Sequence, residues 1–124
     1  MMKKTLIIGA TTNPDRTAYQ AAGMLKDRGH EFVPVGIKEG ELFGQKILMK
    51  DQLTDFSSGP IDTVTLYVRA ELQKDWYEDI LLMRPKRVIF NPGTENQEFQ
   101  EKLSDAGIEP LMACTLVLLS TGQY

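Results

Sequence analysis

Short apolar runs alternate with amphipathic segments along the whole chain. Such short apolar runs predict buried strands, and the run of residues 61–68 also alternates hydrophobic and β-branched residues. The expected strands span residues 5–9, 32–36, 61–68, 87–91 and 108–112. A brief further strand is expected near Lys46, Ile47 and Leu48. Because Pro34 cannot donate a backbone hydrogen bond, the second strand should lie near a sheet edge or a bulge.

Apolar residues at helical spacing follow the first strand, and they predict a helix. The helix should begin at a capping box, with Thr17 as the N-cap and Gln20 three residues later. Gly29 is placed to end this helix in the left-handed conformation. A turn is predicted at residues 57–60, where serine, glycine and proline follow one another.

Two further helices are predicted in the second half of the chain. One stops before Pro85 and presents an apolar face to the core. Its face comprises Leu72, Trp76, Ile80 and Met83. The other begins at a second capping box, residues 94–97, and ends at Gly107. Its inner face comprises Phe99, Leu103 and Ala106.

This alternation of strands and helices predicts parallel βαβ units. The expected fold class is α/β, a Rossmann-like, doubly wound, mostly parallel sheet with helices on both faces. The length of 124 residues suits a single domain, residues 1–124, and no internal repeat, linker or low-complexity tract divides it.

Composition narrows the classes of function. Hydrophobic residues make up 42% and charged residues 25%, which is typical of a globular chain and not of a disordered one. The formal net charge of −3 argues against a general nucleic-acid binder. One Cys and one His, His30, exclude a disulfide framework and a metal site rich in these residues. We therefore expect no metal ligands, and no residue is assigned a catalytic role.

The first residues do not have the pattern of a targeting segment. The basic N-terminus is followed by an apolar run of residues 6–8 only, whereas a signal peptide needs roughly 7–15 apolar residues. No stretch approaches the roughly 20 apolar residues of a membrane span. We expect a cytoplasmic protein without a membrane partner, in which Cys114 is a reduced thiol.

Ligands of an open α/β sheet bind outside the carboxyl ends of its strands. Residues 9–17, 36–38, 67–69 and 91–94 lie at such ends. Where such a loop leads into a helix, unsatisfied backbone N–H groups favour a phosphate or pyrophosphate. Only Gly9 in the first loop matches the glycines of G-x-G-x-x-G, which weakens a nicotinamide or flavin assignment. Lys38 and Arg16 suit a phosphorylated ribose, and they fit equally well as solvated surface charges.

Several segments together carry a resemblance to a known family. They are GATTNPDR at residues 9–16, PVG at 34–36, IDTVTLY at 61–67, PKRVIFNPGTEN at 85–96 and ACTLV at 113–117. In this order they resemble the small single-domain CoA-binding proteins, which are similar to the CoA-binding domain of the succinyl-CoA synthetase α subunit. The resemblance extends over essentially the whole chain. It implies a Rossmann-like fold that holds CoA or an acyl-CoA across the strand ends.

The resemblance also implies a role for each candidate residue. The pyrophosphate would be surrounded by the loop that begins at Gly9, with Ala10, Thr11, Thr12, Asn13, Arg16 and Thr17. The adenosine and its 3′-phosphate would lie by Gly36 and Lys38. The adenine or the pantetheine arm would be flanked by Tyr67 and Val68. The pantetheine end would lie near Pro92, Gly93 and Thr94.

Three functions stay open at this point. The first is a CoA-binding carrier, sensor or regulatory module without covalent chemistry of its own. The second is an NADP-dependent reductase or dehydrogenase, in which Lys38 would select the phosphorylated ribose. The third is the CoA-binding subunit of a larger acyl-CoA enzyme, so a partner subunit or a second copy of the chain is a possible partner.

Two interpretations of the role of Cys114 are open. A lone cysteine is more often a small buried residue. Alternatively, Cys114 follows an expected strand and can open a short helix, where a thiol becomes more acidic and could exchange with the thiol of CoA. The synthetase reaction itself is not implied, because it also needs a phosphorylated His in a second domain and a β subunit.

Overall fold

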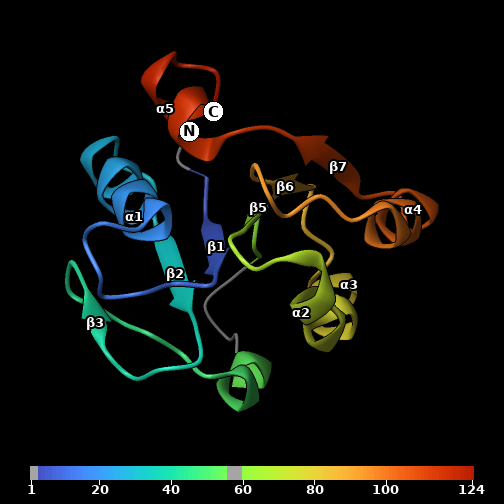
Figure 1. Cartoon of the computed structure of the whole chain (residues 1–124), viewed down its shortest axis with the longest axis horizontal. Coiled ribbons are helices and arrows are strands. Elements are labelled where there is room, and N and C mark those ends of the chain that lie inside the picture. Colours follow the sequence, from blue (N-terminus) through green and yellow to red (C-terminus); the bar gives the residue numbers. More distant parts are fainter. Residues whose placement is uncertain (1–2, 56–59) are drawn as a thin grey trace.

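A parallel sheet forms the centre of the protein. The computed structural model describes residues 3–55 and 60–124, and within them the main sheet has five strands in the order β2-β1-β5-β6-β7 (Figure 1). They are β1 (Thr5–Ile8), β2 (Phe32–Val35), β5 (Thr63–Leu66), β6 (Arg87–Phe90) and β7 (Glu109–Met112). Every neighbouring pair is parallel. The carboxyl ends of these strands therefore lie together at one end of the sheet.

The predicted strands are confirmed, although each is at least one residue shorter than expected. Pro34 lies in an edge strand, as its missing N–H predicts, and its carbonyl accepts a hydrogen bond from Leu48 at 2.9 Å. The brief additional strand is confirmed in part. A hairpin is formed by β3 (Glu41–Leu42) and β4 (Gln45–Lys46), while Leu48 makes an isolated bridge to Val35. Of the turn predicted at 57–60, all but Pro60 lies outside the described residues.

Helices cover both faces of the sheet (Figure 1). On one face lie α1 (Thr17–Asp27) and α5 (Thr115–Ser120), and here Ile7 of β1 shares an apolar cluster with Leu25 and Leu119. On the other lie α3 (Tyr77–Met83) and α4 (Gln97–Asp105), and here Leu6 shares a cluster with Ile80. Alternate residues of β1 thus enter different clusters, because a strand of a doubly covered parallel sheet is buried on both sides. The expected Rossmann-like α/β fold is confirmed.

The predicted second helix is divided into α2 (Ala70–Gln73), the 3₁₀ turn η2 (Lys74–Trp76) and α3. Trp76 and Ile80 face the core as expected, but the prediction for Leu72 is wrong because half of its surface is exposed. Gln73 is fully buried in its place. A 3₁₀ turn has about three residues per turn and not 3.6, so it shifts the inward face of the segment.

Both predicted capping boxes are wrong. Arg16 is the N-cap of α1, its side chain makes no capping hydrogen bond, and Thr17 is the first helical residue. At α4 the N-cap is Asn96, whose side chain accepts a hydrogen bond from the Phe99 N–H at 3.1 Å. Thr94 lies two residues before this N-cap, in the turn after β6, where its hydroxyl donates to the Asn91 carbonyl at 2.8 Å.

The predicted helix ends are confirmed. Gly29 and Gly107 both have φ of +78°, the left-handed conformation expected just after a helix. α3 stops at Met83, two residues before Pro85. A further 3₁₀ helix, η1 (Lys50–Asp55), lies between the hairpin and β5.

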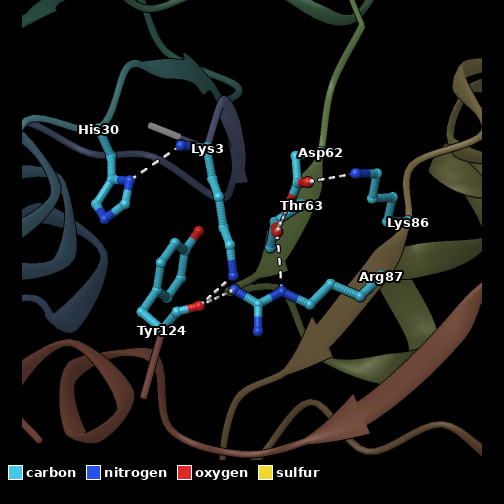
Figure 2. Close-up of polar contacts among 7 residues, drawn as sticks. All are labelled: Lys3, His30, Asp62, Thr63, Lys86, Arg87 and Tyr124. Atoms are coloured by element: carbon cyan, nitrogen blue, oxygen red, sulfur yellow. Dashed lines mark hydrogen bonds and ion pairs between the residues drawn. The ribbon is translucent and has the colours of Figure 1, made fainter. Parts of the chain in front are cut away.

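Polar side chains join the amino ends of three neighbouring strands to Tyr124 (Figure 2). Arg87, at the start of β6, donates to the Thr63 hydroxyl at 2.9 Å and to the main-chain oxygen of Tyr124 at 3.0 Å. The guanidinium also lies 4.6 Å from the centre of the Tyr124 ring. Lys3 donates to the same main-chain oxygen, and the Tyr124 hydroxyl bonds with the Thr5 hydroxyl. The segment after α5 is thereby fixed across the starts of β1, β5 and β6.

Arg87→Met should therefore lower the free energy of unfolding by about 1–3 kcal/mol, because it removes two hydrogen bonds and a ring contact. Urea denaturation measures the loss. Lys86→Met is the matched control, since this side chain is 86% exposed and lies 3.7 Å from Asp62. The control should change the free energy by less than about 0.5 kcal/mol. Equal losses in the two variants would contradict the structural role of Arg87.

Candidate functional site

The direction of the strand order changes at β1. The chain passes from β1 to β2 on one side, and then continues through β5, β6 and β7 on the other. The helices that follow β1 and β5 lie on opposite faces, and in open α/β sheets this reversal is the position outside the strand ends at which ligands bind. The first predicted loop, residues 9–17, begins there, and Tyr67 follows β5 at the same end.

The loop after β1 is held by both neighbouring strands. The N–H groups of Gly9 and Ala10 each donate to the Val35 carbonyl at 2.9 Å, and the Tyr67 N–H donates to the Ile8 carbonyl at 2.8 Å. Gly9 has φ of +97°, and a β-carbon there would lie 2.9 Å from the Tyr67 carbonyl oxygen. Only glycine fits this crossing without displacing the main chain.

Gly36 makes a second close approach. A β-carbon at this position would lie 2.7 Å from the Ala10 carbonyl oxygen, and the Gly36 N–H donates to the Leu48 carbonyl at 3.0 Å. The loops after β1 and β2 therefore meet main chain to main chain. This is the close packing that a cradle for a nucleotide diphosphate requires.

The first loop is shaped by its own polar groups. The Thr11 hydroxyl accepts from the Asn13 N–H at 3.2 Å, and the Asn13 side chain accepts from the Asp15 N–H at 3.0 Å. The Asn13 carbonyl accepts from the Arg16 N–H at 3.1 Å. α1 follows directly, with no acidic residue in its first turn and no capping side chain. The positive end of its dipole is therefore open to an anion.

Positive side chains accompany this helix end. Arg16 and Lys38 are exposed, and neither forms an ion pair within residues 3–55 and 60–124. Arg69, directly after Val68, is also exposed and lies 3.4 Å from Glu71. Local positive charge is thus present at the strand ends, although the net charge of the chain is −3.

Asn91 ties the end of β6 to both neighbouring elements. Its side chain is buried, and its amide nitrogen donates to the Thr65 hydroxyl at 2.7 Å and to the Leu66 carbonyl at 2.8 Å. Its amide oxygen accepts from the Thr115 N–H at 2.9 Å, and the Thr115 hydroxyl lies 2.7 Å from that of Thr65. The first residue of α5 is therefore fixed to the sheet. Cys114, the N-cap of α5, is half-buried.

The Tyr67 hydroxyl is buried close to the Thr65 and Thr115 hydroxyls, but no hydrogen bond of good geometry joins it to any described residue. Burial raises the pKa of Tyr67 to about 12, although the two threonine hydroxyls act to lower it. The ring as a whole is half-buried. The Tyr67 hydroxyl is therefore not available to a ligand, and only part of its ring is exposed.

The structure brings most of the predicted site residues together. Contacts of Gly9 with Tyr67 and of Gly36 with Ala10 join the loops after β1, β2 and β5. Thr94 is linked to Val68 through Gln73, which donates to both carbonyls. Further residues complete the list: Pro92 and Gly93 are exposed after β6, and Thr11, Thr12, Asn13, Arg16 and Thr17 follow β1.

Sequence patterns missed Gln73 and Thr115 as parts of this site. Asn91 was placed in the strand-end loop of residues 91–94, but its role in joining β6 to β5 and α5 was not predicted. Gln73 carried no signal of its role, because its neighbour Leu72 satisfied the helical period that the pattern follows.

An open hollow of about 580 Å³ lies elsewhere, beside the amino end of β2. It is lined by residues that include Lys26, His30, Phe32 and Phe43, and by none of the predicted site residues. The Nδ1 atom of His30 accepts from the Lys3 N–H at 3.1 Å (Figure 2), and burial together with nearby cations lowers the pKa of His30. The single His thus belongs to the end of the sheet opposite the candidate site.

No helix within the described ranges is long and apolar enough to cross the bilayer. Over those same ranges, His, Cys, Asp and Glu side chains form no group of three that could hold a metal ion.

The fold and the strand-end loops define an α/β domain of the Rossmann-like class. The model of a family described as a CoA binding domain matches residues 3–120, so the chain belongs to this family. The predicted resemblance is confirmed at this level, whereas the bound ligand and the individual site residues stay predictions.

Relatives share the whole domain. An uncharacterized protein with a crystal structure is 52% identical in sequence. Its structure matches this one with a TM-score of 0.89, over 100% of this chain and 99% of the other. A hypothetical protein from Pyrococcus horikoshii OT3 is 27% identical, with a TM-score of 0.84 over 97% of this chain and 83% of the other. The uncharacterized protein YneT of Bacillus subtilis (strain 168) is 27% identical over 110 residues, which are 89% of this chain and 79% of YneT.

Tyr67→Phe should maintain or slightly raise the free energy of unfolding at neutral pH, because it removes a buried hydroxyl that has no partner. The folded-state pKa of about 12 lies above the unfolded value of about 10. The folded state therefore holds this proton more tightly, and wild type should lose stability as pH rises from about 10 toward 12.

Urea denaturation of wild type and Tyr67→Phe at neutral and alkaline pH measures both effects. The advantage of the variant should grow above pH of about 10. A loss of more than about 1 kcal/mol in the variant at neutral pH would show that the hydroxyl is hydrogen-bonded.

Proposed function

We propose that this protein binds CoA or an acyl-CoA across the carboxyl ends of β1, β2, β5 and β6. The observation that carries the proposal is the start of α1. This helix has neither a capping side chain nor an acidic first turn, and it opens at the reversal in strand order beside two glycine contacts. Membership of the CoA binding domain family supports the same ligand.

The diphosphate of CoA would lie against the loop from Gly9 to Asn13 and the first turn of α1. Two anionic groups are well matched to several main-chain N–H groups and a helix dipole. Arg16, the exposed N-cap of α1, would add a side-chain donor, and Thr17 would line the same turn.

The two halves of CoA would then extend along the strand ends in opposite directions. Adenosine and its 3′-phosphate would lie toward the loop after β2, where Gly36 gives close access and exposed Lys38 supplies a cation. The pantetheine arm would lie toward the loops after β5 and β6, along Tyr67, Val68, Pro92, Gly93 and Thr94.

In this proposal the protein holds CoA and does no covalent chemistry on it alone. Its single His is engaged at the other end of the sheet, which supports a carrier, sensor or regulatory module. The same binding would suit a cytoplasmic protein that acts with a second copy of itself or with a partner subunit.

Thermal denaturation with a panel of ligands tests the proposal. CoA or acetyl-CoA at 100 times its Kd should add about 2.7 kcal/mol to the free energy of unfolding, whereas NAD and NADP should add little. Stabilisation by NADP without stabilisation by CoA would favour a nicotinamide-dependent enzyme and overturn the proposal.

Lys38→Ala tests the placement of the 3′-phosphate. If an exposed ammonium group meets this phosphate, the variant should bind CoA roughly fivefold more weakly and dephospho-CoA with nearly unchanged affinity. The loss should shrink at high salt, which screens exposed charges. Calorimetry measures both affinities, and Lys86→Met serves as a control for the loss of an exposed lysine far from the site. Equal losses for the two ligands would contradict the placement.

A further inference from the structure

We infer that Gln73 is a positioning residue for the pantetheine half of the ligand, an inference that rests on the proposed CoA binding. Gln73 contacts the main chain of two loops that follow neighbouring strands β5 and β6. It sets the distance between these loops, and with it the width of the channel that the pantetheine arm would occupy.

The side-chain amide of Gln73 is fully buried and uses all its atoms. Its nitrogen donates to the Val68 carbonyl at 2.8 Å and to the Thr94 carbonyl at 2.7 Å. Its oxygen accepts from the Asn96 side chain at 2.9 Å. One amide group thus bridges the loop after β5, the loop after β6 and the start of α4.

Asn96 fixes this bridge from the other side. Its amide oxygen caps α4 by accepting from the Phe99 N–H at 3.1 Å, and its nitrogen also donates to the Tyr77 hydroxyl at 2.7 Å. The Tyr77 ring in turn stacks on Phe99, with 4.3 Å between the ring centres. A buried network whose polar groups are all paired holds a single arrangement firmly.

The chemistry of the position favours glutamine over other residues. An apolar side chain of the same length would leave the Val68 and Thr94 carbonyls without this donor. A carboxylate would face two carbonyl oxygens and would itself be buried without a cation. The amide offers two donors and one acceptor at the reach that the two loops require.

Loss of the Gln73 bridge should affect the binding of the pantetheine half of the ligand and not that of the nucleotide half. The loops after β1 and β2 are fixed by main-chain contacts at Gly9 and Gly36. Gly9 meets the loop after β5 at Tyr67, through main-chain contacts separate from the hydrogen bonds of the Gln73 side chain. Loss of the bridge should therefore disturb the pantetheine channel and leave the nucleotide cradle intact. A general loss of stability would affect both halves alike.

The test compares CoA with adenosine 3′-phosphate 5′-diphosphate, which is CoA without its pantetheine arm. Calorimetry gives both affinities for wild type and for Gln73→Met, which has similar length but cannot donate. We expect the variant to bind CoA roughly tenfold more weakly, with less than about a twofold change for the nucleotide alone. Gln73→Asn, which retains the amide but is one methylene shorter, should show the same selectivity and serves if Gln73→Met does not fold.

Ile80→Val is the matched control, since it lowers core packing beneath the same segment and leaves every hydrogen bond of the Gln73 side chain in place. It should leave the ratio of the two affinities unchanged. Equal losses for both ligands, or unchanged CoA binding, in the Gln73 variants would overturn the inference and leave the proposed function standing. Absence of CoA binding by wild type would overturn the proposed function and the inference with it.

Discussion

The candidate site depends on one close approach, that of Gly9 to the main chain of Tyr67. A β-carbon at Gly9 would lie 2.9 Å from the Tyr67 carbonyl oxygen, so the ends of β1 and β5 can meet in this way only with glycine at this position. The chain then turns into α1 within a few residues, and the first turn of that helix has no capping side chain. The close approach and the uncapped helix start therefore lie at the same end of the sheet, at the reversal in strand order, where an anionic ligand is favoured.

The two ends of the sheet are built differently. At the carboxyl ends, close glycine contacts occur together with buried side-chain amides, whereas at the amino ends the side chains of Lys3 and Arg87 hold the main chain of Tyr124. α5 joins the two ends, because its first residue is bound to Asn91 and the segment after it is held by Arg87. A helix of six residues is too short to be stable alone, so α5 depends on these polar attachments and on the burial of Leu119.

Local patterns predicted the elements better than their contacts. The β-branched runs located each strand of the sheet, and Gly29 and Gly107 located two helix ends, because strand burial and left-handed glycine leave marks in neighbouring residues. The capping boxes failed for a different reason. Thr94 has the right residue type for an N-cap, but the turn after β6 places it two residues before the N-cap position, and Asn96 caps α4 instead.

By itself, the sequence determined the alternation of strands and helices, the loops that follow the strands, and the ordered segments that identify the family. These properties depend on residues close together along the chain. Only the tertiary structure decided that Gln73 is buried in place of Leu72, that the Tyr67 hydroxyl has no partner among the described residues, and that Arg87 holds Tyr124. Each of these depends on contacts between groups far apart in sequence, which form only in the folded sheet. A pattern of neighbouring residues therefore cannot predict them.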